Sequence, residues 1–360
     1  MDLEVKVFDP KTGREQQRRL FKACFPETIG TVLEKDYYYD WKFHQASDNK
    51  ALSYEYGAYF DGKLVGYYGW VPVPYNIEGK ETREVIACDA MIDSSFRKKG
   101  IFSKLGFYSL EQLKSNKIDF TVGYALRPEV IPGHLKVGWK IAFDLPFYAK
   151  ILDSQSVLKA KKIAFLAPIA NILFKIYNSF FKINFSKNNL FSIQTIDAKE
   201  LMDLEEYDDF FKDWCSQLHN YLIKSRDFLK WRLGAPETKY YVTIVRRDNR
   251  IVALAITTRK VFDGIPFLGI VDLMVLNDNY SCLKLIYREV ESIAKRISAE
   301  ALGFVINKSW RKKFALFSNG FIRSPFTFKF IINRLNEELD YASLLNEKNW
   351  CSTWLNSDHL

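Results

Sequence analysis

Hydrophobic residues recur along the first third of the chain with two different periods. Alternating apolar and polar positions predict strands, whereas apolar residues three or four positions apart predict helices. Asp61-Gly62 separates the first two predicted strands and is a strong signal for a tight hairpin. The predicted elements are, in order, a helix over 16–24, strands over 54–60, 64–71 and 84–92, a helix over 100–113 and a strand over 120–124. A helix between two strands of this length predicts a parallel crossover, so the sheet is mixed.

The same order of elements returns in the second half of the chain. Strands are predicted over 240–245, 251–257, 269–276 and 302–306, with a strongly periodic helix over 282–296 before the last of them. Asp248-Asn249 marks the repeated hairpin turn. A repeated order of this kind indicates an internal duplication. We therefore predict an α/β protein with two tandem domains over 1–150 and 190–335, a helical linker over 151–189 and a tail over 336–360.

The predicted linker contains an amphipathic segment, over 161–182, that is interrupted at Pro168. One interpretation is a helix lying on an anionic membrane. That helix would use Phe165, Phe174, Phe180 and Phe181 together with Lys175 and Lys182. The other is an inter-domain or dimer helix that buries the same apolar face, which is the more common use of such a stripe. The pattern leaves a homodimer open.

Composition narrows the class of protein. Hydrophobic residues make up 48% and charged residues 26%, which excludes a disordered or low-complexity chain. The 52 basic and 43 acidic residues give a net charge of +9. A basic surplus suits nucleic acid, anionic lipid or a phosphate-bearing small molecule. Because the basic residues are scattered rather than clustered on one segment, nucleic acid ranks last and no nucleic-acid partner is expected.

Cysteine, histidine and the apolar runs point to a reduced, cytoplasmic protein without metal. The five cysteines show no Cys-x-x-Cys spacing, which favours free thiols. The four histidines lie far apart and match no metal-binding pattern, so no metal is expected. The N-terminus lacks the apolar core of a signal peptide. The least polar run, 163–174, is shorter than the ~20 residues that span a bilayer, so no transmembrane segment is predicted.

The most informative segment is 90–102, where a strand ends, a short basic loop follows and a helix begins. Arg97, Lys98, Lys99 and Gly100 occupy the loop. Unpaired amides at a helix start, the helix dipole and three cations together attract an anion. Gly100 lets the backbone approach a phosphate closely because it has no Cβ. The alternative is a solvated basic turn that only joins the strand to the helix.

This segment resembles the acetyl-CoA signature of the GNAT acetyltransferase superfamily, Arg97-x-x-Gly100-x at the start of a helix. His134-Leu135-Lys136-Val137-Gly138-Trp139 is similar to the superfamily's second landmark, an aromatic residue that follows a glycine after the next strand. The resemblance covers roughly 15–150, and 190–335 resembles a second such domain by its order of elements. It implies an acetyl-CoA co-substrate held by Met91, Ile92, Asp93, Arg97, Lys98, Lys99, Gly100, Ile101 and Phe102.

The sequence departs from the superfamily pattern at several positions. Phe102 stands where glycine or alanine is common, so its ring either narrows the pyrophosphate pocket or points into the core. His134 stands where the superfamily's second landmark usually has a tyrosine that acts as an acid. Arg127 stands where an asparagine is often found. The second repeat has lost the basic loop, because 277–281 carries neither arginine nor glycine and includes Asp278. We therefore expect one coenzyme A site, in the N-terminal domain.

Acetyl transfer needs an oxyanion donor and a proton acceptor. Backbone amides around Met91 and Ile92 are the expected donors to the thioester oxygen. Asp89, in an otherwise apolar strand, is the first candidate base; the alternative is a structural carboxylate paired with a neighbouring amide or cation. His134 is the second candidate, against a simple turn histidine. Tyr124 is the third, against a core aromatic residue.

The acceptor is less defined than the donor. Tyr37, Tyr38, Tyr39, Tyr67, Tyr68, Trp70 and Tyr75 form either walls for a sugar or base, or a tyrosine-rich core. The chain most resembles tandem enzymes of bacterial surface-polysaccharide synthesis, including lipopolysaccharide, which implies a nucleotide-linked amino sugar as the amine acceptor. Other amines (an aminoacyl group, a polyamine or an antibiotic) stay open. A non-catalytic module that binds a glycan or a partner is the alternative from another class.

Overall fold

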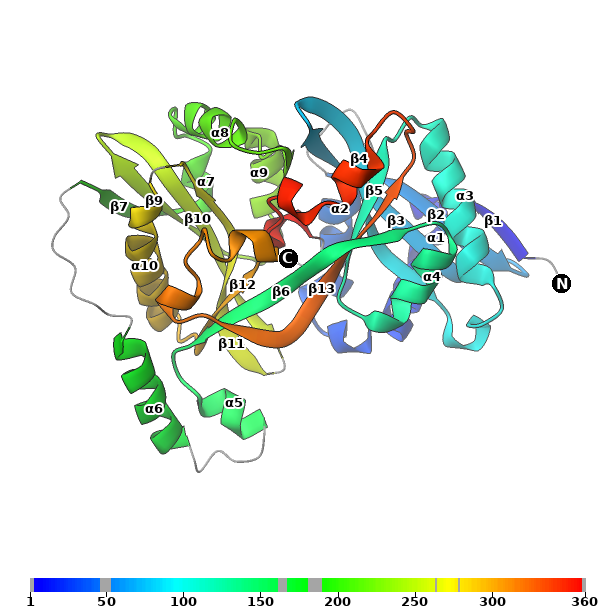
Figure 1. Ribbon diagram of the computed structural model, residues 1–360. Helices are drawn as coiled ribbons and strands as arrows, with labels where there is room; N and C mark the ends of the chain where they lie inside the picture. Colours follow the sequence, from blue (N-terminus) through cyan, green and yellow to red (C-terminus); the bar gives the residue numbers. More distant parts are fainter. Residues whose placement is uncertain are drawn as a thin grey trace. The chain divides into compact units, whose positions relative to one another are not determined.

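The computed structural model describes residues 3–45, 53–160, 167–180, 190–262, 264–277 and 279–357 (Figure 1). The chain forms two compact units, each assembled from three segments. The first unit contains Met1–Phe143, His219–Glu237 and Phe328–Asn349. The second unit contains Asp144–Leu218, Thr238–Thr327 and Trp350–Leu360.

The first unit is built on a mixed sheet with the strand order β1-β2-β3-β4-β5-β13. Its strands are β1 (Leu3–Val7), β2 (Tyr54–Phe60), β3 (Lys63–Ile77), β4 (Lys80–Ile92), β5 (Phe120–Ala125) and the end of β13 (Ile322–Arg334), with β8 (Asn220–Leu222) paired to the end of β3. Its helices are α1 (Pro10–Cys24), α2 (Asp36–His44), α3 (Ile101–Ser115), α4 (Ile131–Lys136), α9 (Arg226–Leu233) and α11 (Tyr341–Leu345). Among the described strands of this unit, only β4 and β5 run parallel, and they are joined through α3.

The second unit repeats this arrangement, with the strand order β7-β9-β10-β11-β12-β6. Its strands are β7 (Ser192–Asp197), β9 (Tyr240–Arg247), β10 (Arg250–Phe262), β11 (Ile265–Val275), β12 (Ala301–Val305) and the end of β6 (Lys140–Ile151). Its helices are α5 (Gln155–Ala160), α6 (Ala167–Phe180), α7 (Ala198–Leu201), α8 (Tyr207–Cys215) and α10 (Leu283–Arg296). Here the parallel pair is β11 and β12, joined through α10.

The two predicted hairpin turns have the backbone that their residues favour. Asp61 and Gly62 have φ of 48° and 77°, and Asp248 and Asn249 have φ of 51° and 61°. Two consecutive residues at positive φ make the tight turn that matches the twist of the flanking strands. The strand that closes each sheet comes from the other half of the sequence: β13 pairs with β5, and β6 pairs with β12. The predicted class, an α/β fold of two tandem domains, is confirmed.

β3 continues beyond the predicted end at residue 71, through Pro72 and Pro74. Proline lacks the N–H that a central strand needs, which is why the sequence indicates an earlier end. The pairing with β2 stops at Trp70 and the pairing with β8 starts at Tyr75, so the prolines lie between two strand partners. On this edge, in the described part of the chain, only the Pro74 carbonyl is used, by the Ile223 amide at 2.8 Å. Edge positions of this kind tolerate proline because no ladder hydrogen bond is lost.

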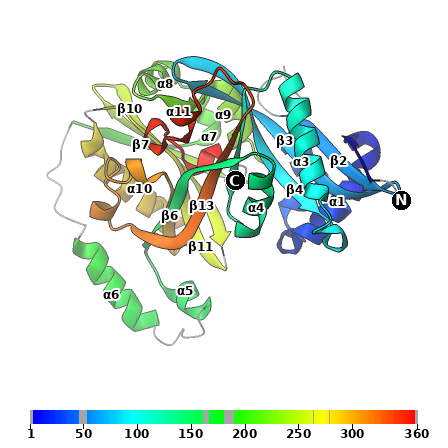
Figure 2. The same cartoon turned by 45° about the vertical axis from the view of Figure 1, so that its right-hand side comes forward.

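Aromatic residues fill the core of the first unit. α3 contacts β2 and β3, and α1 contacts β3 and β4 (Figure 2). Tyr68 and Trp70 pack under α3, and Trp70 stacks on Trp139 at 6.0 Å. Six of the seven aromatic residues considered as ligand walls are at most 6% exposed: Tyr38, Tyr39, Tyr67, Tyr68, Trp70 and Tyr75. Only Tyr37 is exposed among these seven, at 47%, so the interpretation as a tyrosine-rich core is confirmed for the rest.

The predicted linker, over 151–189, contains two helices in its described part. α5 and α6 account for all the described residues between Gln155 and Phe180, after β6 ends at Ile151. Phe165, Phe181 and Lys182 lie outside the described residues. In the described part of the chain, no helix is both long and apolar enough to cross a membrane.

Candidate functional site

A bulge in β4 opens the sheet of the first unit. Met91 pairs with Tyr67 and Cys88 pairs with Gly69, so Asp89 and Ala90 together face the single residue Tyr68. Parallel pairing joins β4 to β5 only over Glu84–Ile86, although β4 runs on to Ile92 and β5 to Ala125. Beyond the bulge, the edge of β4 that faces away from β3 therefore has no strand partner among the described residues. Unpaired backbone groups on a strand edge are available to a ligand.

Asp89 sits at the strained point of this bulge. Its φ of 49° lies in the left-handed region, which costs a residue with a Cβ roughly 1–2 kcal/mol. Lys42 Nζ lies 2.9 Å from Asp89 Oδ1, and the two side chains are only 12% and 15% exposed. Lys42 is thus the cation partner that we expected for Asp89 if it is a structural carboxylate. Its catalytic role stays a prediction.

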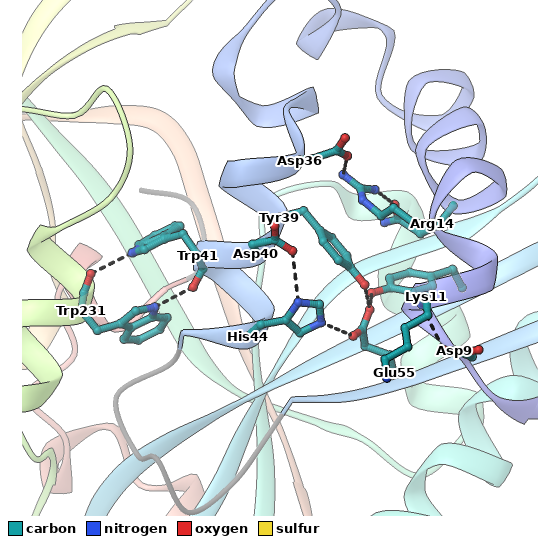
Figure 3. A network of polar contacts seen from close by, with 12 residues as sticks. Asp9, Lys11, Arg14, Asp36, Tyr39, Asp40, Trp41, His44, Glu55 and Trp231 are labelled. Carbon is teal, nitrogen blue, oxygen red and sulfur yellow. Dashed lines mark hydrogen bonds and ion pairs between the residues drawn. The ribbon is translucent and has the colours of Figure 1, made fainter.

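α2, which carries Lys42, is held against the sheet by a buried network (Figure 3). Glu55 accepts hydrogen bonds from the Tyr39 and Tyr67 hydroxyls, and His44 Nε2 lies 3.3 Å from its other oxygen. Trp41 donates its indole N–H to the Trp231 carbonyl at 2.8 Å, and Trp231 donates to the Trp41 carbonyl at the same distance. These contacts fix the helix from two sides.

Gly69, the β3 residue that pairs with Cys88 just before the bulge, lies against Phe43 of α2. A Cβ on Gly69 would lie 2.6 Å from Cε1 of Phe43, a distance that no packed pair tolerates. Phe43 is the residue after Lys42, so the missing side chain at Gly69 lets both residues reach the bulge. Packing on one side and an ion pair on the other hold Asp89 in its unusual conformation.

The basic loop that follows β4 is shaped by its own residues. Asp93 caps a short 3-10 turn over Ser94–Phe96, accepting from the Ser95 amide at 3.0 Å and from its hydroxyl at 2.6 Å. The hydrogen bond from the Ser95 hydroxyl lowers the pKa of Asp93. Arg97 Nε donates to the Ile92 carbonyl at 3.3 Å. Asp93 thus shapes the loop, and its side chain is turned toward Ser95.

The start of α3 leaves donors free for an anion. Lys98 and Gly100 have φ of 62° and 76°, and Gly100 precedes the helix without any side-chain cap. In the part of the chain that the structure describes, no acceptor is bound to the amides of Lys98, Lys99 or Gly100. A Cβ on Gly100 would meet no atom within 4 Å, so the space beside it is open. Open space, free amides and exposed cations fit a diphosphate.

The remaining predicted cofactor residues face inward. Ile101 belongs to the core under α3, and Met91 belongs to the core on the α1 face. Phe102 packs on His134, with ring centroids 5.1 Å apart, and its ring would collide with a Cβ on Gly133. The Phe102 ring therefore joins the core, and the departure from the superfamily pattern does not place it beside Gly100. Of Met91, Ile101 and Phe102, only the backbone is available to a ligand in the open loop.

His134 is a buried residue of α4 that forms hydrogen bonds with two other residues. Its Nδ1 lies 2.8 Å from the Val130 carbonyl and therefore carries the proton, so Nε2 accepts from the Tyr68 hydroxyl at 2.8 Å. The side chain is 4% exposed, and burial lowers its pKa. Both nitrogens are thus occupied by protein groups. Arg127, just before α4, is also tied down, in an ion pair with Glu27.

A carboxyl group on β4 was missed by the sequence analysis. Glu84 is 1% exposed, neither of its oxygens has a hydrogen-bond partner, and burial raises its pKa well above the ordinary value. Its register partners are Val73 and Phe120, so it shares a face with Tyr75 and Tyr124. The Tyr75 and Tyr124 hydroxyls lie 3.1 Å apart. The available signal was an acidic residue at the start of the apolar strand.

The second unit repeats the bulge without the basic loop. Ile256 pairs with Asp272 and Thr257 with Ile270, which leaves Val271 as the extra residue. Asp272 is buried and accepts from the Thr353 hydroxyl at 2.9 Å. The Asn277 amide donates to Gln217 Oε1 at 2.7 Å, while Asp278 lies outside the described residues. The expectation that coenzyme A does not bind here stays a prediction.

No cluster of three or more histidine, cysteine, aspartate or glutamate side chains with the geometry of a metal site occurs in the described ranges. Near β4, Asp89 is paired with Lys42, and Glu55 lies 3.3 Å from His44 Nε2.

Comparison with known proteins places the fold. Residues 11–142 match the family model of the acetyltransferase (GNAT) domain. A search of curated protein sequences found no match. The structure is similar to a GCN5-related N-acetyltransferase from Anabaena variabilis (12% identity, TM-score 0.62, 93% of this chain and 73% of that one). It is also similar to a probable N-acyltransferase from Enterococcus faecalis (11%, 0.63, 93% and 73%).

A third similar structure is the N-myristoyltransferase of Saccharomyces cerevisiae with bound myristoyl-CoA (12% identity, TM-score 0.62, 92% of this chain and 79% of that one). At these identities the likeness establishes the fold, and it extends over both units. The match over 11–142 confirms the predicted resemblance of this segment to the GNAT domain, and with it the prediction of an acyltransferase.

The buried state of His134 predicts a pH dependence of stability. Because burial lowers its pKa in the folded state, the unfolded chain binds more protons below the ordinary histidine value of 6.5. The free energy of unfolding should therefore fall as the pH drops below 6.5, and His134→Gln should flatten that fall between about pH 7 and pH 5.5. Urea denaturation at several pH values measures both slopes.

Comparing the pH dependence of unfolding between the wild type and His134→Gln also removes the contribution of His44. The hydrogen bond to Glu55 raises the pKa of His44, so its contribution is lost as the pH rises and has the opposite sign. Both proteins contain His44, and its contribution cancels between them. Parallel slopes for the wild type and His134→Gln would contradict the assignment of His134 as a buried neutral residue.

Proposed function

We propose that this protein transfers an acetyl group from acetyl-CoA to a primary amine, by direct attack of the amine on the thioester and without a covalent enzyme intermediate. The observation that carries the proposal is the open loop before α3. Its free amides, the left-handed Gly100 and the exposed Arg97, Lys98 and Lys99 lie directly after the strand that separates from β5.

The residues divide the binding task between side chains and backbone. Arg97, Lys98, Lys99 and the amide of Gly100 hold the diphosphate, since charge-assisted hydrogen bonds to phosphate are about twice as strong as neutral ones. The unpaired edge of β4 up to Ile92 supplies amides for the rest of the donor and for the oxyanion that develops on the thioester oxygen.

Glu84 supplies the proton acceptor in this proposal. His134 has both nitrogens bonded, Asp89 is paired with Lys42, and the Tyr124 hydroxyl contacts that of Tyr75. Glu84 is buried on the same central strand and its oxygens have no partner. A carboxyl with a raised pKa is, once ionised, a stronger base than an ordinary glutamate, and it is poised to take a proton from an ammonium group.

We further propose a nucleotide-linked amino sugar of bacterial surface-polysaccharide synthesis as the acceptor. The net charge of +9 supports an anionic acceptor. Because the aromatic residues of the first unit are mostly buried, recognition rests on charge and hydrogen bonds rather than on stacking. The identity of the acceptor is tested by a screen of amines. The screen includes aminoacyl groups, polyamines and antibiotic amines, with acyl donors of several chain lengths.

Calorimetric titration of acetyl-CoA tests the cradle. The wild type should bind at one site, and Gly100→Trp should weaken binding by about two orders of magnitude, the loss of two charge-assisted hydrogen bonds at roughly 1.5 kcal/mol each. Gly79→Trp is the matched control, because Gly79 also has a positive φ (84°) with no neighbour near its Cβ but lies at the opposite end of β4. Equal loss in both variants, or no binding to the wild type, overturns the assignment.

Substitution of Glu84 tests the proton acceptor. Glu84→Gln should lower kcat by about 10²–10⁴-fold with little change in acetyl-CoA affinity, and should remove the acidic limb of the pH–rate profile. Glu81→Gln, an exposed acid on the same strand, should leave kcat unchanged. Full activity of Glu84→Gln together with loss of activity in Asp89→Asn would contradict the proposal and identify Asp89 as the proton acceptor.

A further inference from the structure

α6 presents its polar side to the protein and its apolar side to solvent, the reverse of an ordinary surface helix. Five apolar residues are at least 50% exposed: Ile169, Ile172, Leu173, Ile176 and Phe180. At 3.6 residues per turn they fall within an arc of about 100°. They form one continuous stripe, which we call the α6 apolar stripe.

The opposite side of α6 is attached by hydrogen bonds of asparagine. Asn171 Oδ1 accepts from the amide and hydroxyl of Ser154 at 2.7 and 2.6 Å, and Asn171 Nδ2 donates to Asp153 at 3.1 Å. One heptad later, the buried Asn178 donates to the Ile151 carbonyl at 2.8 Å. These bonds fix the rotation of the helix, so the α6 apolar stripe faces outward by construction. In both views α6 lies beside α5 (Figures 1 and 2).

Basic residues predominate around the helix, where Asp153 is the acid bonded to Asn171. The sequence from 155 to 196 contains six lysines and no acidic residue. Lys159 and Lys175 are exposed, and neither has an acidic partner among the described residues. Lys175 lies on α6 beside the apolar stripe. Two copies of the chain would bring these exposed lysines together, with Asp153 already engaged by Asn171, whereas an anionic lipid surface pairs them with phosphate.

We infer that α6 docks the protein on an anionic lipid bilayer, with the α6 apolar stripe inserted at the level of the headgroups and acyl-chain ends. An amphipathic helix with lysine on its flank and isoleucine, leucine and phenylalanine on its face lies in the plane of the interface. The helix lies on the surface rather than spanning it, because 14 residues are too few to cross a bilayer. This inference does not depend on the proposed acetyl transfer.

Flotation of the purified full chain with vesicles tests the inference. The protein should float with vesicles of phosphatidylcholine and phosphatidylglycerol, much less with phosphatidylcholine alone, and less as salt rises. Ile172→Asp/Ile176→Asp should lower the partition coefficient at least about 10-fold. Both residues are 50% or more exposed, so the fold is retained, which circular dichroism checks.

A matched variant and a second measurement separate the alternatives. Val261→Asp/Ile322→Asp also places charges on exposed apolar positions of the second unit, 57% and 46% exposed, and should float like the wild type. Sedimentation velocity measures self-association without lipid. Absence of flotation, equal flotation of the stripe variant, or a dimer that Ile172→Asp/Ile176→Asp dissociates would each overturn the inference.

Discussion

The bulge at Asp89 and Ala90 is the constraint on which the candidate site depends. It follows the point, after Ile86, where the pairing of β4 with β5 stops after three residue pairs, and it lies on the part of β4 that has one free edge. The conformation is strained at Asp89, and the Lys42 ion pair and the packing of Phe43 on Gly69 offset that cost. α2, with its buried anchors at Glu55 and Trp231, therefore matters to the site although it lies on another part of the chain.

The two units show which features belong to the fold and which to the chemistry. Among the described residues, both have four successive antiparallel strands, a bulge before the crossover helix and a parallel strand after it. Only the first combines the bulge with Arg97, two lysines and a left-handed glycine. The second keeps a buried aspartate at its bulge, whose Oδ1 accepts from the Thr353 hydroxyl. Asp89 and Asp272 thus have a structural partner in each unit, which supports Glu84 as the proton acceptor.

Much of the fold could be predicted from the sequence because local patterns determine it. The hairpin turns, the crossover helices and the basic loop each depend on residues adjacent in sequence. The strand exchange of β6 and β13, the bulge and the attachment of α9 through Trp231 depend on contacts between distant residues and carry no local signal. Likewise, the stripe on α6 was visible in the sequence, but only the bonds of Asn171 and Asn178 show that it faces outward.

Hydrogen–deuterium exchange with and without acetyl-CoA tests the central claim, that the open edge and loop of the first unit form the single coenzyme A site. The account predicts slower exchange of the amides from Met91 to Ser103 when acetyl-CoA is present, with no change from Asn277 to Leu283 in the second unit. Protection in the second unit, or unchanged exchange in the first at saturating acetyl-CoA, would contradict it.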